Sequence, residues 1–175
     1  MSSLLNRAAL LVKDFEKADV LDHAAKAAAS PSYFAALVRY LQDKDKVVAT
    51  RASWCLNWAA RRNPSYVQPH VGVLAELLQQ PAAPAAVVRN CASILQDVSI
   101  PEVYQGIVMN TCFELVTNPA TPIAIKAFSL TILDHLSHEY PEIKPELQLI
   151  IETQLEKETA AFRSRAKKIL KRLQR

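Results

Sequence analysis

The sequence predicts an all-α fold in which pairs of helices stack in succession. Three observations support this prediction. The 175-residue chain has only two glycines and is rich in alanine and leucine, which favours helices over turn-rich β structure. Its ten prolines fall mainly between apolar segments, where they separate helices. The apolar helical patterns recur at steps of 40, 37 and 37 residues, as they do in proteins built from stacked helical repeats.

The clearest helical pair runs from Val48 to Leu78 and is interrupted at Asn63-Pro64. Apolar or small residues at i, i+4, i+7 and i+11 mark one face of each helix. They are Val48, Ala52, Cys55 and Ala59 in the first helix and Val67, Val71, Leu74 and Leu78 in the second. Neither helix can bury such a face alone, so the pair requires neighbours of its own kind.

The pattern of this first helix returns three times along the chain. It returns at Val88, Ala92 and Leu95, at Ile125, Ser129, Ile132 and Leu136, and at Phe162, Ala166, Ile169 and Leu173. A basic residue follows the opening apolar residue each time, as Arg89, Lys126 and Arg163. The second helices also repeat, because VQPHV at Val67 is matched by IKPEL at Ile143, 76 residues later. A two-helix repeat of this length indicates a solenoid.

We expect the following helices in chain order. One or two N-terminal helices lie within Ser3 to Ala29, and Ser30-Pro31 opens a helix that runs to Gln42, since serine is a good N-cap and proline a good first residue. The first helices of the pairs run about Val47 to Arg62, Ala85 to Val98, Pro122 to Glu139 and Thr159 to Gln174. The second helices run about Ser65 to Gln80, Pro101 to Asn118 and Pro145 to Glu158.

The last expected helix, Thr159 to Gln174, is strongly basic and has no second helix after it. Its apolar face is expected to cover the final helical pair, and its lysines and arginines would keep the outer face soluble. A basic amphipathic helix can instead bind a membrane surface or a calmodulin-like partner. Of these two interpretations we favour the capping helix.

These features together resemble the HEAT-repeat, or armadillo-like, family of α-solenoids. The resemblance lies in the apolar-basic dipeptides, in the small residues at i+4, and in the turns Pro64 to Pro69 and Pro141 to Pro145. It implies a right-handed α-α superhelix in one domain, residues 1–175. About three full repeats would occupy residues 47–80, 85–118 and 122–158, between N-terminal helices (1–46) and a basic capping helix (159–175).

Charge is divided between the two helix types, because the second helices carry mainly glutamates and the first helices mainly arginines and lysines. In the family that the chain resembles, second helices line the concave side, which implies an acidic to neutral groove. Such a groove attracts basic peptides or basic protein patches. We therefore expect a non-catalytic scaffold for a protein or peptide partner, although the glutamates can also serve simply as solvated surface. The expected partner-binding residues are Gln68, Glu76, Glu114, Glu146 and Glu152.

A second interpretation is nucleic-acid binding by the first helix of the Val48 pair. Its basic and aromatic residues are Arg51, Trp54, Trp58, Arg61 and Arg62. We expect the two tryptophans to pack against the preceding helices, near Phe34 and Tyr40, but an exposed pair would offer a stacking platform. The chain would then resemble the HEAT-like alkylpurine DNA glycosylases. A likeness to phycobilin lyase-type auxiliary enzymes has no residue signature in the chain.

The sequence favours neither an enzyme nor a metal or cofactor site. Cys55, Cys91 and Cys112 lie within apolar helical patterns, as reduced buried thiols do. His135 and His138 stand at i and i+3, but a zinc site needs three or four converging ligands. Two glycines cannot form a glycine-rich phosphate loop.

The overall charge and hydropathy exclude other classes of protein. A net charge of +4 is too small to indicate nucleic acid by itself. No stretch reaches the roughly 18 uncharged apolar residues of a membrane-spanning helix. We therefore expect a cytoplasmic protein.

Overall fold

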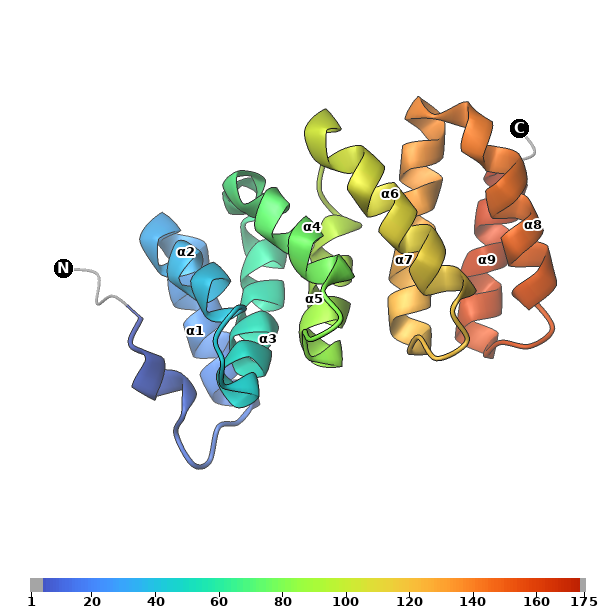
Figure 1. Ribbon diagram of the computed structural model, residues 1–175. Helices are drawn as coiled ribbons and strands as arrows, with labels where there is room; N and C mark the ends of the chain where they lie inside the picture. The colour runs from blue at the N-terminus through green and yellow to red at the C-terminus, as the bar shows by residue number, and fades with distance from the viewer. Residues whose placement is uncertain (1–4, 174–175) are drawn as a thin grey trace. The chain divides into compact units, whose positions relative to one another are not determined.

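The computed structural model describes residues 5–173, which contain helices and no strand (Figure 1). The predicted all-α fold is confirmed. The α-helices are α1 (Lys17–Ala29), α2 (Pro31–Tyr40), α3 (Lys46–Arg62), α4 (Val71–Gln79), α5 (Ala85–Leu95), α6 (Glu102–Thr117), α7 (Ile123–Glu139), α8 (Lys144–Gln154) and α9 (Ala160–Leu173). Short 3-10 helices are η1 (Arg7–Leu10), η2 (Pro64–His70) and η3 (Pro141–Ile143).

The helices form two compact units, and the boundary lies between Ile100 and Pro101. The first unit contains the helices from η1 to α5. The second contains α6 to α9. Each unit has its own helix contacts and is described separately below.

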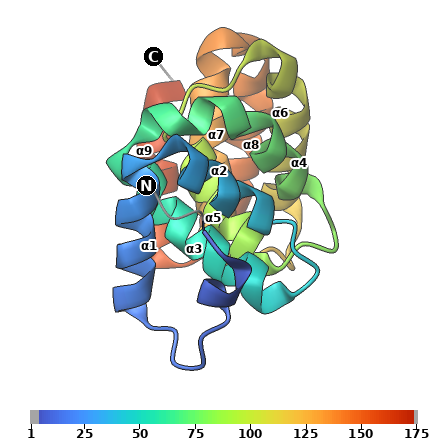
Figure 2. The ribbon, with the colours of Figure 1, turned by 90° about the vertical axis from the view of Figure 1, so that its left-hand side faces the viewer.

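In the first unit, α1, α3 and α5 lie side by side, and α2 and α4 pack over them (Figures 1 and 2). The central helix of this layer is α3, since it packs against both α1 and α5. The second-type helices pack on the first-type helices that follow them, α2 on α3 and α4 on α5. The two helix types therefore occupy separate layers, as expected for stacked helical pairs.

Prolines and side-chain caps set where the helices begin. Ser30 caps α2 by accepting a hydrogen bond from the Tyr33 amide at 3.4 Å, with Pro31 as the first helical residue, as predicted. Asp45 caps α3 through the Val47 amide at 2.9 Å. The helices α5, α6 and α7 each begin directly after a proline, at Pro84, Pro101 and Pro122.

The second-type helix expected over Ser65 to Gln80 is shorter than predicted. Residues Pro64 to His70 form the 3-10 helix η2, and α4 begins only at Val71. Pro69 lies inside η2 and lacks an amide hydrogen, so it cannot take part in a continuous α-helical hydrogen-bond ladder. The matching IKPEL segment behaves similarly, with η3 preceding α8. Three other helices end at least two residues earlier than expected: α2 at Tyr40, α5 at Leu95 and α8 at Gln154.

The N-terminal segment from Ser3 to Ala29 agrees, in its described part, with the expectation of one or two helices. It contains η1 and α1, separated by a non-helical stretch from Leu11 to Glu16, while Ser3 and Leu4 lie outside the described residues. The stretch ends in a capping box, in which the Glu16 amide donates to the Asp19 carboxylate at 2.8 Å.

The second unit repeats the two-layer arrangement in a smaller form. Here α6 packs extensively on α7, while α9 packs on α7 and also contacts α8. The buried residues of α9 are Phe162, Ala166 and Ile169. The apolar face that these side chains form is therefore covered by packing within the second unit.

The predicted repeat positions lie in the core. Every residue of the Val48 and Val67 patterns is buried, as are the corresponding positions of α5 and α7. In α9 three of the four predicted positions are buried, and Leu173 is partly exposed. Since full burial of one large apolar side chain contributes about 1.5–3 kcal/mol, these recurring positions account for much of the stabilisation between neighbouring helices.

Candidate functional site

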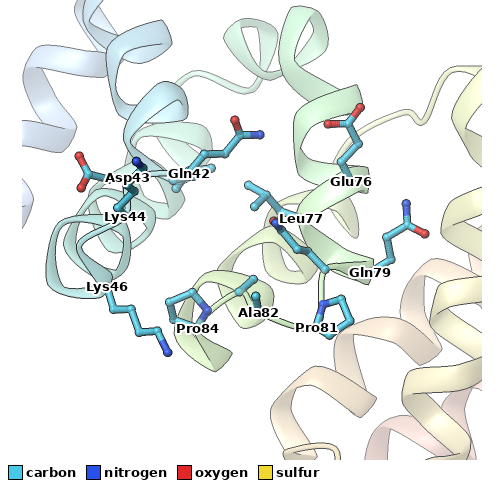
Figure 3. A pocket seen from close by; sticks show the side chains of 13 residues that line it. Gln42, Asp43, Lys44, Lys46, Glu76, Leu77, Gln79, Pro81, Ala82 and Pro84 are labelled. Carbon is cyan, nitrogen blue, oxygen red and sulfur yellow. The ribbon is translucent and has the colours of Figure 1, made fainter.

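The first unit has a surface groove at the C-terminal ends of α2 and α4. Its volume is ≈ 790 Å³. One wall is the loop from α2 to α3, and the other comes from the end of α4 and the loop to α5. Figure 3 shows Gln42 and Leu77 pointing toward one another across this groove. The charged residues along it are Asp43, Lys44, Lys46 and Glu76.

The negative charge of Asp43 is not available to a partner in the groove, because Asp43 forms an ion pair with Arg7. The Arg7 Nε and Nη2 atoms donate to the two carboxylate oxygens of Asp43 at 2.8 and 2.9 Å. The Asp45 amide also donates to Asp43 at 2.9 Å. Hydrogen bonding from Arg7, followed by that from the Asp45 amide, lowers the pKa of Asp43 to about 2.

Glu76 is therefore the carboxylate of the groove that is left for a partner. It is exposed on α4, and no hydrogen bond or ion pair of its side chain is found within residues 5–173. Lys44 and Lys46 are exposed on the opposite wall (Figure 3). The groove thus presents a negative charge on one side and two positive charges on the other.

The other predicted partner-binding residues lie elsewhere on the second-type helices and their flanks. Gln68 is exposed on η2, where its Nε2 donates to the Ser99 carbonyl at 3.2 Å. Glu114 is exposed on α6, and Glu146 and Glu152 are exposed on α8. Glu152 accepts a hydrogen bond from Gln148 at 2.8 Å. Gln68 and Glu76 belong to the first unit, and the other three belong to the second.

The residues considered for nucleic-acid binding all lie on α3, but two of its arginines already have protein partners. The Arg51 Nη1 donates to the carbonyls of Leu10 and Val12 at 2.8 and 3.0 Å, and its guanidinium lies 4.7 Å from the Phe15 ring centroid. Arg62 donates to the Leu21 carbonyl at 3.3 Å. Arg51 thus connects the non-helical N-terminal stretch to α3 by hydrogen bonds.

The two tryptophans differ from the expected packing. Trp54 is 39% exposed and so is not a core residue, while Trp58 is partly exposed, with the Arg61 guanidinium 5.5 Å from its ring centroid. Phe34 packs against Tyr66 and His70 instead. The Tyr40 hydroxyl donates to the Leu5 carbonyl at 3.4 Å. The helical pattern located the buried seam of α3 correctly but did not reveal the partners of these rings.

Comparison with known protein families agrees with this arrangement of helices. The family model of the HEAT repeat domain matches residues 7–173, nearly the whole chain. The chain belongs to the HEAT repeat family. A comparison with curated proteins found no significant match. Membership identifies a helical-repeat scaffold, while the partner has to be inferred from the surface of the HEAT helices themselves.

The HEAT core does not activate its cysteines. Cys55, Cys91 and Cys112 are buried, and burial raises the pKa of each thiol to about 12. Their thiols are therefore protonated near neutral pH and act as small core residues. His135 and His138 are exposed on α7, and residues 5–173 contain no group of three or more side chains placed to hold a metal ion. In the same range, no helix combines the length and apolarity needed to cross a bilayer.

A polar network between the HEAT helices α3 and α5 was missed by the sequence reasoning. Asn90 is buried, and its Nδ2 donates to Ser53 Oγ at 2.9 Å. Asn57 Nδ2 donates to Asn90 Oδ1 at 3.3 Å. A signal was present in α5, where Asn90 and Ser93 interrupt a largely apolar helix. Buried polar groups of this kind need partners, which indicates interhelical contacts or a ligand.

Proposed function

We propose that the protein is a non-catalytic HEAT scaffold that binds a segment of a protein partner in the groove between α2 and α4. The segment places a lysine or arginine beside Glu76 and a carboxylate beside Lys44 or Lys46. Recognition then follows from charge complementarity on a preformed surface. Glu114, Glu146 and Glu152 supply a separate acidic surface, on the second unit, for a basic partner.

The observation that carries this proposal is the charge pattern of the groove. Its exposed charges have no partners of their own among the described residues, whereas the neighbouring Asp43 is neutralised by Arg7. Charged residues are also divided unevenly between the helices. The helices α4, α6 and α8 contain five glutamates and one lysine, whereas α3 and α5 contain basic residues and no acidic ones. An unpaired charge in a concave surface selects partners of opposite charge.

Selection from a random library of short peptides by the full-length protein tests the proposal. We expect enrichment of peptides that carry lysine or arginine. Glu76→Lys should weaken binding of the selected peptides by about tenfold, because it replaces an attraction by a repulsion.

Asp14→Lys is the matched control, since Asp14 is exposed in the non-helical N-terminal stretch and does not line the groove. Equal loss of binding in both variants would show that only net charge matters and would refute the groove. The triple variant Glu114→Lys, Glu146→Lys and Glu152→Lys separates the contribution of the second unit.

Nucleic-acid binding on α3 is the second candidate, and the exposure of Trp54 is the observation that favours it. Arg61 and Arg62 are exposed on the same helix. Against it, Arg51 is bonded to the N-terminal stretch, and the acidic Asp97 lines the same small hollow as Arg61. A labelled DNA duplex distinguishes the two functions: binding at low salt that weakens by orders of magnitude at moderate salt would favour this candidate, and absence of binding at low salt would exclude it.

A further inference from the structure

The wall of the groove opposite Glu76 contains two aspartates beside its two lysines. The loop between α2 and α3 carries Asp43, Lys44 and Asp45, and Lys46 is the first residue of α3. Opposite charges so close together in an exposed segment attract one another, and pairing between them would cancel the charge of the wall. Yet neither lysine forms an ion pair within residues 5–173.

Both aspartates are engaged instead by Arg7, which belongs to the 3-10 helix η1. Its Nε and Nη2 atoms donate to the two carboxylate oxygens of Asp43 at 2.8 and 2.9 Å, and Nη2 lies 3.6 Å from a carboxylate oxygen of Asp45. Hydrogen bonds within the segment support this arrangement. The Asp45 amide donates to Asp43 at 2.9 Å, and the Asp45 carboxylate accepts from the Val47 amide at 2.9 Å. One guanidinium therefore compensates two carboxylates.

The directions of the side chains agree with this division of charge. Figure 3 shows the Asp43 carboxylate pointing away from Glu76 and Pro81, whereas the Lys46 side chain extends toward Pro84. The Asp43 side chain is 14% exposed, while Lys44 and Lys46 are exposed residues. The wall thus presents positive charges to the groove, and the negative charge of Asp43 is directed toward η1.

Contacts elsewhere in the N-terminal segment determine where Arg7 lies. Leu5 and Leu10, on either side of it, are buried. The Tyr40 hydroxyl donates to the Leu5 carbonyl at 3.4 Å, and Arg51 Nη1 donates to the Leu10 carbonyl at 2.8 Å. The planar guanidinium of Arg7 is therefore held near the loop and loses little conformational freedom when it pairs, unlike the flexible side chain of a lysine.

We propose that Arg7 is a positioning residue of the groove, because its engagement of the two aspartates leaves Lys44 and Lys46 free for a carboxylate of the partner. The inference rests on the function proposed above and names the residue that gives this wall its positive charge. Without Arg7, the aspartates would pair with the neighbouring lysines, and the wall would lose its attraction for an acidic residue. The N-terminal segment thereby controls which charge a partner has to present here.

Peptides from the library selection, tested against variants of the full-length chain, measure this role. The probes are the tightest-binding selected peptide and the same peptide with its acidic residue replaced by alanine. Arg7→Ala should weaken binding of the acidic peptide roughly threefold, since exposed ion pairs are individually weak, and should leave binding of the alanine peptide unchanged. A purely structural role of Arg7 would weaken binding of both peptides alike.

A second substitution and a control separate the charge of Arg7 from its contribution to folding. Adding Asp43→Asn to Arg7→Ala should recover part of the loss, because it removes a carboxylate that would otherwise pair with the lysines. If Arg7 only stabilised the loop, Asp43→Asn would restore nothing. Lys17→Ala is the matched control, since Lys17 is exposed at the start of α1, does not line the groove and carries the same charge. Melting temperatures check that each variant remains folded.

An NMR titration of the Asp43 carboxyl group tests the pair without any ligand. Hydrogen bonding from Arg7 lowers the pKa of this carboxyl group to about 2 in the wild type. The pKa should rise in Arg7→Ala and stay unchanged in Lys17→Ala.

Several outcomes would overturn the proposal. They are equal losses for the two peptides, equal effects of Arg7→Ala and Lys17→Ala, no recovery with Asp43→Asn, and an Asp43 pKa that does not change in Arg7→Ala. Enrichment of basic peptides that lack an acidic residue would also overturn it, while leaving the selection by Glu76 intact. Failure to enrich any peptide would overturn the proposed function and this inference together.

Discussion

His23 is a buried base and His70 a partly buried one, and both couple the stability of the fold to pH. His23 Nδ1 lies 2.7 Å from the Tyr33 hydroxyl, and its ring stacks on Phe15 with centroids 5.9 Å apart. His70 stacks on Phe34 at 5.8 Å. Burial lowers the pKa of both, and Lys26 lowers that of His23 further, against smaller opposing effects of nearby acidic groups and the Ala9 backbone.

The stability of the protein should therefore fall as the pH drops below about 6.5. A lowered pKa means that the unfolded chain binds protons more readily than the folded chain, so stability is complete above the unfolded pKa and is lost on acidification. Melting temperatures at pH 7.5 and 5.5 measure this. His70→Phe keeps the stacking on Phe34 and should reduce the difference between the two pH values. An unchanged difference would mean that other groups cause it. Asp43, with a pKa of about 2, contributes only in more acidic solution.

Single residues also show where sequence reasoning reaches its limit. Core positions such as Val48 and Cys55 could be predicted, because burial follows the helical period. The engagement of Arg51 could not, because its partners Leu10 and Val12 lie about 40 residues away in a stretch without periodicity. Ser93 is a second example of this limit. Its position in an apolar helix was visible in the sequence, but the lack of a hydrogen-bond partner for its hydroxyl depends on the packed structure.

At the scale of elements, α9 is held in the second unit by buried apolar residues and by hydrogen bonds from two of its arginines, and the turn before it is held by an ion pair. Arg165 Nη1 donates to the Ala127 carbonyl at 3.0 Å, and Lys126 pairs with Glu158 at 2.8 Å. Arg172 Nε donates at 2.9 Å to Asp134, whose side chain is buried. The arginines of α9 therefore contribute to its packing. The helix could be predicted from its period, but the acidic partner Asp134 lies on α7 and was not apparent from local sequence.

Removal of the Arg172 side chain should destabilise the protein. Arg172→Ala leaves the buried Asp134 carboxylate unpaired, and we expect a loss of about 1–3 kcal/mol in the free energy of unfolding, reduced from the fully buried case because the Arg172 side chain is half exposed. Chemical denaturation measures this loss.

Adding Asp134→Asn to Arg172→Ala should recover part of the loss. Lys168→Ala, at an exposed position of α9, is the control and should change stability by less than about 0.5 kcal/mol. Equal effects of Arg172→Ala and Lys168→Ala would contradict the role of the ion pair.

Some boundaries of the other helices could be predicted from the sequence and others could not. Caps and prolines such as Ser30, Pro84 and Pro122 could be predicted as helix starts because their effects are local. The 3-10 geometry of Pro64 to His70 was not predicted, although Pro69 supplied the reason for it. The periodic apolar pattern continued across this segment and suggested one longer helix.

At the scale of the whole molecule, the chain is a HEAT protein whose helices form two compact units. In helical-repeat proteins each layer is stabilised mainly by its neighbours, so stability varies along the chain. The repeat pattern predicted the stacking of helix pairs. The boundary at Ile100 and Pro101 was not predicted, because the period passes through it without a change in composition.

A core substitution should accordingly act mainly within its own unit. Leu133→Ala in α7 and Leu37→Ala in α2 remove fully buried side chains, each at a cost of about 2–5 kcal/mol. Amide hydrogen exchange should show lost protection in α6 to α9 for Leu133→Ala, and in α1 to α5 for Leu37→Ala. Uniform loss of protection across the chain in both variants would contradict two separately cooperative units.

The central claim is that Glu76 selects a basic partner residue in the groove of the first unit, and a reciprocal charge exchange tests it most directly. Isothermal titration would measure the dissociation constants of wild type and Glu76→Lys for a selected peptide and for the same peptide with its essential basic residue replaced by glutamate. We expect each single change to weaken binding by about tenfold and the two changes together to restore most of the affinity. Additive losses, with no recovery in the doubly exchanged pair, would contradict the claim.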